Sequence, residues 1–235
     1  NLVLMFNDYE KGLYNTEFFE LLGLGVIPLV IAKEKMERVK EAAGEKPLVS
    51  LTPFKPMKAG IVTTGNEVCY GRIKDTFTPV IEGKLAEFDT EIIDHVTWND
   101  DDTKVTASIL DMIKKGADIV VCTGGMSVDP DDKTPLAIKN TGADIVSYGA
   151  PVLPGAMFML AYYQVTEGEN PRTVAIMGLP GCVMYAKRTI FDLVLPRVMA
   201  DDQVTAEELA ALGPGGLCLN CPVCTFPNCG FGKGV

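Results

Sequence analysis

Histidine and positive charge are scarce in this chain of 235 residues. It has one histidine, and 21 lysines and arginines stand against 31 aspartates and glutamates, giving a formal net charge of −10 at pH 7. An acidic surface does not attract nucleic acid or an anionic membrane, so neither is expected as a partner. The lone histidine, His95, falls in the strand-like run IIDHVTW, away from the glycine-rich loops, which favours a structural role over that of a catalytic base.

The chain also lacks a long apolar helix. Its longest uncharged stretch, residues 145–166, is long enough to raise the question of a membrane span. Gly149, Pro151, Pro154 and Gly155 interrupt that stretch, which predicts a strand, a loop and a second buried strand MFMLAYY instead. We therefore expect no membrane contact.

The sequence shows no secretory signal, and its seven cysteines are an odd number that cannot all pair. This indicates a reducing cytoplasm, in which thiols bind metal rather than form disulfides. The first residue is Asn1 rather than methionine, which is consistent with a fragment or with missing leading residues. With 47% hydrophobic and 22% charged residues, the chain can form one globular core and one smaller appendage.

Three segments differ in their pattern. Residues 1–57 combine two short apolar runs, a charged helix around KEKMERVKEAAG and a proline-rich linker, and they form a small N-terminal piece. Residues 58–200 alternate strands with helices, and residues 201–235 form a cysteine-rich tail. Strands that are apolar on both faces and alternate with helices predict an α/β three-layer sandwich around a largely parallel sheet.

Within residues 58–200 the apolar pattern predicts six strands and four helices. The strands are AGIVTTG, TEIIDHVTW, ADIVVCTGG, DIVSYG, MFMLAYY and RTVAIMG. The helices are expected at 79–88, 101–116, 134–142 and 182–199. Thr78 should cap the first helix, and Pro196 should kink or end the last.

Three strand ends carry glycine-rich loops: TTGNEVCYGRIKD after the first strand, TGGMSVDPDDKTP after the third and GLPGC after the last. Glycine lets backbone N–H groups face outward, and the following helix adds the positive end of its dipole, so such loops can hold an anion. In open α/β sheets ligands bind at the carboxyl ends of the strands. Taken one at a time, these loops are routine features of this architecture.

Taken together, the loops resemble the molybdopterin-binding domain shared by the molybdopterin adenylyltransferase and molybdopterin molybdenumtransferase families. The family pattern of TG-x-E-x, then TGG with a following D-x-T, then LPG is present as TTGNEV, TGGMSVDPDDKT and GLPG. The resemblance covers about residues 58–200 and keeps the order and the strand context. It implies that the ligand is molybdopterin, which combines a pterin, a dithiolene and a terminal phosphate, or its adenylated form.

The resemblance assigns ligand contacts to the loops, with backbone amides for the phosphate and carboxylates for the pterin N–H groups. The implied ligand-binding residues are Thr64, Gly65, Glu67, Thr123, Gly124, Gly125, Met126, Ser127, Thr134, Leu179, Pro180, Gly181 and Cys182. Catalytic roles fall to Asp75 and Asp132, whose carboxylates also suit Mg²⁺ or the positioning of molybdate.

Several of these residues have a structural interpretation as well. Asp132 lies at an expected helix start, where an acid is stabilising, and Asp75 could cap the next helix likewise. Glu67 could bridge the glycine turn to a backbone amide. Cys182 stands where the family has Asn or Ser followed by Pro, at an expected helix N-terminus that would lower the pKa of its thiol, and simple packing is the alternative.

Four cysteines gather near the end of the chain, at Cys218, Cys221, Cys224 and Cys229. Thiolates two residues apart can close on one metal centre, so this run predicts a metal site. The first three match a ferredoxin-like spacing, whereas zinc ribbons set two Cys-x2-Cys pairs well apart, so a [4Fe–4S] cluster is favoured over zinc. A metal-bearing tail suits anaerobic redox partners.

The resulting hypothesis is a cytoplasmic homo-oligomer that acts in molybdenum or tungsten cofactor biosynthesis, by molybdate insertion or phosphate-group transfer. The insertion enzymes resembled here carry additional N-terminal and C-terminal domains, whereas we expect only a short N-terminal piece and a cysteine tail around the domain in this sequence. A non-enzymatic molybdopterin carrier or redox sensor, serving molybdoenzymes or redox partner proteins, therefore stays open. A nucleotide pyrophosphatase stays open too, because DPDDKT is similar to a loop of the competence/damage-inducible proteins.

Overall fold

The computed structural model describes residues 32–43, 52–127, 129, 132–166 and 171–233. The chain divides into two compact units, 2–53 and 54–235. In the first, helix α2 (Lys33–Ala43) confirms the charged helix, and both apolar runs expected before it lie outside the described residues. Within the described residues, no helix combines the length and the apolar character that crossing a membrane would require.

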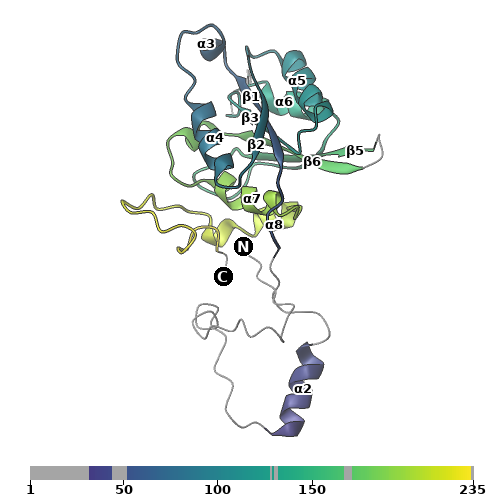
Figure 1. Cartoon of the computed structure of the whole chain (residues 1–235). Helices are drawn as coiled ribbons and strands as arrows, with labels where there is room; N and C mark the ends of the chain where they lie inside the picture. Colours follow the sequence, from purple (N-terminus) through teal and green to yellow (C-terminus); the bar gives the residue numbers. More distant parts are fainter. Residues whose placement is uncertain (1–31, 44–51, 128, 130–131, 167–170, 234–235) are drawn as a thin grey trace. The chain divides into compact units, whose positions relative to one another are not determined.

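The second unit is built on a six-stranded sheet in the order β2-β1-β3-β6-β5-β4 (Figure 1). The strands are β1 (Lys58–Thr64), β2 (Glu91–Trp98), β3 (Ile119–Thr123), β4 (Asp144–Tyr148), β5 (Met159–Val165) and β6 (Arg172–Leu179). The first four in spatial order run parallel, and β5 and β4 complete the sheet in antiparallel fashion. All six expected strands are therefore present, and the largely parallel sheet is confirmed.

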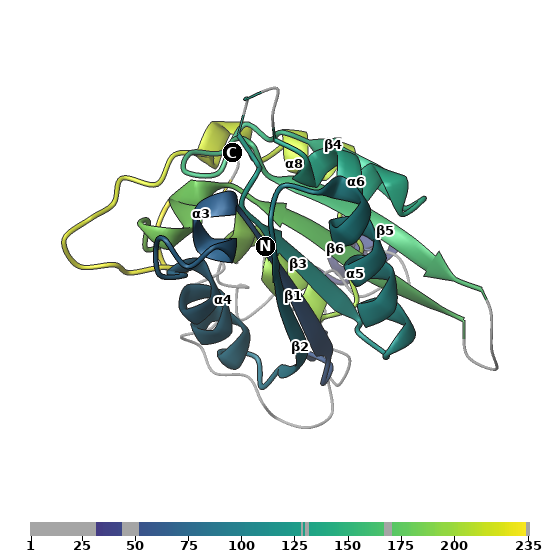
Figure 2. The ribbon, with the colours of Figure 1, turned by 90° about the horizontal axis from the view of Figure 1, so that it is seen from above.

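Helices cover both faces of this sheet, as Figure 2 shows from above. On one face lie α5 (Asp102–Lys114) and α6 (Thr134–Asn140), and on the other α4 (Phe77–Ala86) and α7 (Ile190–Met199). Adjacent strand residues pack into two separate hydrophobic cores. Ile61 lies in the core between the sheet and helices α4 and α7, whereas Val62 lies in the core between the sheet and helices α5 and α6. Burial on both faces explains why the central strands are apolar throughout and confirms the three-layer sandwich.

The expected helix at 182–199 is wrong in its first half. The chain forms a short 3-10 turn, η1 (Gly181–Met184), and α7 begins only at Ile190. Thr189 and Asp192 form a capping box that starts α7 there: the Thr189 hydroxyl accepts the backbone N–H of Phe191 (3.2 Å), and the Asp192 carboxylate accepts the backbone N–H of Thr189 (2.7 Å). The helix passes through Pro196 and ends at Met199.

The start of α4 also differs from the expectation. Thr78 is not the N-cap, because α4 begins at Phe77 with Thr76 in the cap position. The Asp75 carboxylate accepts the backbone N–H groups of Phe77 (2.8 Å) and Thr78 (3.1 Å) and so caps the helix from one residue further out. A second short element, α3 (Asn66–Cys69), precedes it in the first glycine loop.

The C-terminal segment belongs to the same compact unit as the sheet. It contains α8 (Ala206–Ala210) and η2 (Gly213–Gly215), followed by the irregular cysteine loop, drawn in yellow in Figure 1. Phe231 is buried in the α4 and α7 core, and Leu217 forms a β-bridge with Leu153. These contacts attach both ends of the cysteine loop to the body of the unit.

Candidate functional site

The three glycine loops begin side by side at the carboxyl edge of the sheet. In the parallel register Thr63 of β1 lies opposite Thr123 of β3, which lies opposite Leu179 of β6. β2 ends beside them, since Thr64 lies opposite Trp98. Sequence segments far apart in the chain are thus brought to one edge, where a ligand could contact all of them.

Threonine hydroxyls join the first two loops. The Thr64 hydroxyl donates to the Thr123 carbonyl oxygen (3.2 Å) and lies 3.1 Å from the Thr134 hydroxyl, which donates to the Gly124 carbonyl oxygen (2.8 Å). All three threonine side chains are buried. These hydroxyls therefore position the loops, while ligand contact is left to the backbone around them.

The backbone at Gly124 and Gly125 turns into the left-handed region, with φ of +82° and +54°. A Cβ on Gly124 would lie 2.1 Å from the Thr64 carbonyl oxygen, so this close approach requires glycine. Among the described residues, the N–H groups of Gly124, Gly125 and Met126 have no protein acceptor. Successive outward amides in such a turn form a concave site for an anion.

The third loop adds one more donor to this edge. Leu179 and Pro180 are buried, Gly181 is exposed and Cys182 is half-buried. Within the described part of the chain, the Gly181 amide likewise donates to no protein acceptor, whereas the Cys182 amide faces its own thiol. The Met126 side chain is buried against Gly178, so Met126 offers a ligand its backbone alone.

Asp132 folds back onto its own loop. One carboxylate oxygen accepts both the backbone N–H and the hydroxyl of Ser127, each at 2.6 Å. Tyr148, at the end of β4, donates its phenol to the Ser127 carbonyl oxygen (3.1 Å). Burial, and then the charge of Asp132, raises the pKa of Tyr148. Tyr148 is not among the residues expected from the sequence, because nothing in DIVSYG indicates that β4 brings it to this loop.

Asp75 lies in a different cluster, toward β2. Its carboxylate caps α4 and also accepts the Thr78 hydroxyl. That hydroxyl lies 3.1 Å from His95 Nε2, which is also 3.2 Å from the Thr63 hydroxyl and 3.8 Å from Asp75. Asp75 therefore caps a helix and fixes His95 through Thr78, and this hydrogen-bonded setting fits a structural histidine.

The loop after β2 supplies a carboxylate, Asp100, that is not among the residues expected from the sequence. Asp100 accepts the side-chain amide of Asn66 (2.8 Å), which ties the end of β2 to the first glycine loop. The acidic run Asp100 to Asp102 directly after a strand was the available signal. Glu67 nearby has an exposed side chain, and its carbonyl accepts the N–H groups of Arg72 and Ile73.

A family model described as a probable molybdopterin binding domain matches residues 60–200, which is more than half of the chain. The chain belongs to this molybdopterin-binding domain family. The resemblance inferred from the three loops is thereby confirmed, and the matched range includes every strand of the sheet except the first two residues of β1.

Individual relatives match shorter parts of this chain. A CinA-like protein of Mycobacterium tuberculosis (strain ATCC 25177 / H37Ra) is 35% identical over 77 residues, which are 33% of this chain and 18% of that protein. A CinA-like protein of Mycobacterium avium (strain 104) is 34% identical over the same length and the same shares. The matches thus span less than a fifth of these relatives.

One solved structure, described as the tungsten cofactor synthesizing protein MoaB from Pyrococcus furiosus, shares the fold. It aligns with a TM-score of 0.50 and 21% identity over 64% of this chain and 99% of that chain. At this level of identity the likeness concerns the fold, and it supports the mixed α/β, mostly parallel architecture described above.

The two carboxylates expected to act together are not gathered in one group. Asp75 is occupied by α4 and Thr78, and Asp132 by Ser127. Within the described residues, no three His, Cys, Asp or Glu side chains lie close enough to share one metal ion. Asp132 is half-buried like Asp75, but its carboxylate binds the exposed Ser127 instead of capping a helix, so it is the better candidate of the two for contact with a ligand.

The four tail cysteines line one cavity of about 240 Å³ although they are not drawn together as a ligand set. Cys221 and Cys224 are exposed, and Cys218 and Cys229 are partly buried against the core. The cavity wall is completed by Phe226 and by Lys187 and Arg188, the residues just before α7. The molybdopterin-binding domain therefore carries the tail beside the segment that leads from η1 to α7.

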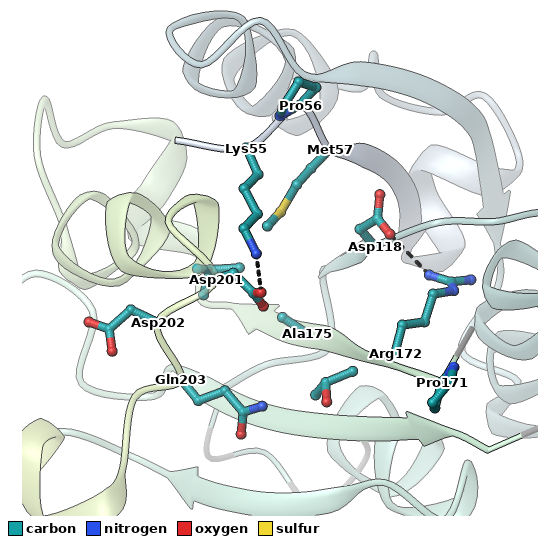
Figure 3. Close-up of a pocket in the computed structure, with 12 residues that line it drawn as sticks. Lys55, Pro56, Met57, Asp118, Pro171, Arg172, Ala175, Asp201, Asp202 and Gln203 are labelled. Carbon is teal, nitrogen blue, oxygen red and sulfur yellow. Dashed lines mark hydrogen bonds and ion pairs between the residues drawn. The ribbon is translucent and has the colours of Figure 1, made fainter. Parts of the chain in front are cut away.

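A second cavity, of about 460 Å³, lies at the opposite, amino edge of the sheet and is shown in Figure 3. Its cations are already paired, since Lys55 bridges to Asp201 and Arg172 pairs with Asp118 while binding the carbonyl oxygen of Ile113. A cation used in this way gives an anionic ligand little net attraction. This cavity is therefore a weaker candidate for molybdopterin than the carboxyl edge.

The Cys182 thiol is expected to be unreactive at neutral pH, contrary to its expected activation at a helix N-terminus. The α-helix expected to begin at Cys182 is absent, and the short 3-10 turn η1 takes its place. Burial raises the pKa of Cys182. A raised pKa leaves less thiolate at pH 7, and the thiolate is the nucleophile. Iodoacetamide labelling of metal-free protein, followed by peptide mass spectrometry, should find Cys182 labelled more slowly than Cys221 and Cys224. Unfolded protein is the control, and faster labelling of Cys182 in the folded state would contradict the expectation.

Proposed function

We propose that this chain binds molybdopterin or its adenylated form at the carboxyl edge of β1, β3 and β6, and acts in molybdenum or tungsten cofactor assembly. The observation that carries the proposal is the set of backbone amides without a protein acceptor at Gly124, Gly125 and Met126, beside that of Gly181, among the residues that the structure describes. Neutral amides can bind a phosphate without a cluster of cations, which suits a chain with a net charge of −10.

The proposed reaction is group transfer at the phosphate or insertion of molybdate at the dithiolene. Asp132 is the carboxylate we assign to this step, because it lies on the amide loop and, among the residues that the structure describes, its carboxylate is held by Ser127 alone. Release from Ser127 would let Asp132 bind a pterin N–H, position molybdate or hold Mg²⁺, since hard cations take carboxylate oxygens. Asp75 and Asp100 support the same edge from the β2 side.

The proposal extends to the tail, where Cys218, Cys221, Cys224 and Cys229 bind a metal centre, with [4Fe–4S] favoured over zinc by their spacing. Support comes from their shared cavity. Sites of this kind form when the metal draws the ligands together, so separated sulfurs in a metal-free arrangement are consistent with it. Such a centre would make a redox partner protein or a molybdoenzyme a natural recipient of the bound cofactor.

A nucleotide pyrophosphatase is the second candidate, and the CinA-like relatives favour it. The same amides at Gly124 and Gly125 would then hold a nucleotide pyrophosphate. A carrier that binds molybdopterin without turnover is the third. The three candidate functions differ in the ligand that the protein binds and in whether it turns that ligand over. Binding and turnover can both be measured on the same protein.

Calorimetric titration under anaerobic conditions should find binding of molybdopterin. Incubation with ADP-ribose, which serves as the nucleotide pyrophosphate, should give no cleavage. Cleavage of ADP-ribose without molybdopterin binding would assign the chain to the second candidate.

In assays of adenylylation and of molybdate insertion, Asp132→Asn should reduce turnover roughly 100-fold, because it removes the charged group near the reacting phosphate. Glu207→Gln, on α8, is the control. Molybdopterin binding with no turnover in either assay would favour the carrier.

A further inference from the structure

Lys187 occupies an unusual position beside the cysteine loop, which we define as residues 218–229. Its ammonium donates to the carbonyl oxygens of Cys221 and Pro222, both at 2.9 Å. It also lines the cavity that the four cysteines share. Both acceptors are uncharged, and in the part of the chain that the structure describes no carboxylate lies within ion-pair distance of Lys187. Its positive charge is therefore available to an anion in the cavity.

The neighbouring cation, Arg188, forms ion pairs with carboxylates. Arg188 pairs with Asp192 (2.9 Å) and Glu87 (3.5 Å), so its charge is offset by two carboxylates. Its guanidinium lies 4.9 Å from the centroid of the Phe226 ring, which fixes the far side of the cysteine loop. Arg188 thus holds the loop by packing, and Lys187 is the cation that stays uncompensated.

A centre held by four thiolates is an anion whichever metal it contains. Four charges of −1 around Zn²⁺, or around a [4Fe–4S] core of charge +2, leave a net charge of −2. An acidic chain would raise the cost of forming such a centre unless a cation lies beside it. Lys187 provides that cation at the carbonyl groups of the loop that carries the sulfurs.

The backbone of Lys187 is fixed independently of the loop. Its carbonyl oxygen accepts the Lys84 ammonium (3.3 Å), which lies between it and the buried carboxylate of Asp192. Three residues earlier the chain leaves η1, whose first residues form the third glycine loop. The backbone of Lys187 is therefore held in place while its side chain contacts the tail, and it lies on the segment that follows the third glycine loop in the chain.

We propose that Lys187 is the counter-cation of a tetrathiolate metal centre formed by Cys218, Cys221, Cys224 and Cys229. Its ammonium holds the loop by two carbonyl groups and offsets the negative charge of the centre, so it is a positioning residue that does not itself bind the metal. This inference rests on the proposed metal site in the tail and adds the residue that stabilises it.

The test compares wild type with Lys187→Met, which keeps the length of the stem and removes the charge, and with Lys187→Arg, which restores the charge. Lys114→Met, on the exposed side of α5, is the matched control. Zinc affinity is measured on metal-free protein against a chelator. We expect Lys187→Met to bind zinc roughly 10- to 100-fold more weakly, the usual effect of losing an outer partner of a metal site, and Lys187→Arg to recover most of it.

Anaerobic reconstitution with iron and sulfide gives a second readout. Reduction adds negative charge to the cluster, so removing the nearby cation should lower its midpoint potential, which a change in packing alone would not do. Zinc affinity and potential unchanged in Lys187→Met would overturn the role of Lys187 while leaving the metal site in place. A wild-type chain that takes up neither zinc nor iron would overturn both. Melting of the metal-free variants checks that each is folded.

Discussion

Gly124→Ala is expected to abolish molybdopterin binding and to lower the free energy of unfolding by about 3 kcal/mol. The new Cβ would lie 2.1 Å from the Thr64 carbonyl oxygen and 2.9 Å from the Thr64 hydroxyl oxygen, and φ at this position is +82°. The two loops would have to separate, which disrupts the amides proposed to hold the phosphate. Urea unfolding measures the stability, and calorimetric titration measures the binding.

Gly142→Ala is a close control for this variant. Gly142 has the same φ of +82°, but a Cβ there would meet no atom within 4 Å. Its cost should be about 1 kcal/mol, from the left-handed backbone alone. Molybdopterin binding should be unchanged. Equal losses of stability in the two variants would show that the approach of Gly124 to Thr64 is not what the fold requires, and retained binding in Gly124→Ala would remove this loop from the site.

Asp192→Ala is expected to lower the free energy of unfolding by about 3–5 kcal/mol. The Asp192 side chain is 3% exposed and accepts the Lys84 ammonium, the Arg188 guanidinium and the Thr189 backbone N–H. Its removal takes away the carboxylate that pairs with the buried Lys84 and removes the capping box at the start of α7. Urea unfolding of the metal-free chain is the measurement.

Asp201→Ala provides the comparison, since Asp201 also pairs with a lysine, Lys55, but both side chains are more than half exposed. An exposed pair contributes about 0–1 kcal/mol, so this variant should remain close to wild type. The double variant Lys84→Met, Asp192→Leu should recover part of the loss, because no unpaired charge is then buried. A cost for Asp192→Ala similar to that of Asp201→Ala would mean that water reaches Lys84.

The position of the carboxyl-edge loops could be predicted from local sequence. The strand pattern and glycine punctuation were enough to predict that 63–75, 123–135 and 178–182 follow strands, and the parallel register then places them side by side. The helix expected at 182–199 failed for a local reason too, since the Thr189 and Asp192 capping signal was overlooked within a longer apolar pattern. Tyr148 could not be found in this way, because its place depends on where β4 joins the sheet.

The roles of individual carboxylates and cysteines could not be predicted from the sequence alone. Sequence alone assigned Asp75 and Asp132 the same role, but the fold engages Asp75 in the α4 cap near His95 and leaves Asp132 on the amide loop. Burial of Cys182 reversed the expected direction of its pKa shift, because desolvation depends on neighbours that the motif does not contain.

By itself, therefore, the sequence determined the α/β architecture, the family and the glycine loops that follow the strands, because strand periodicity and turn chemistry are local properties. The tertiary structure decided which side chains within those loops are occupied by other parts of the protein. It alone brought Lys187 to the four-cysteine loop, since the contact joins residues more than 30 positions apart and depends on the packing of α4, α7 and the tail.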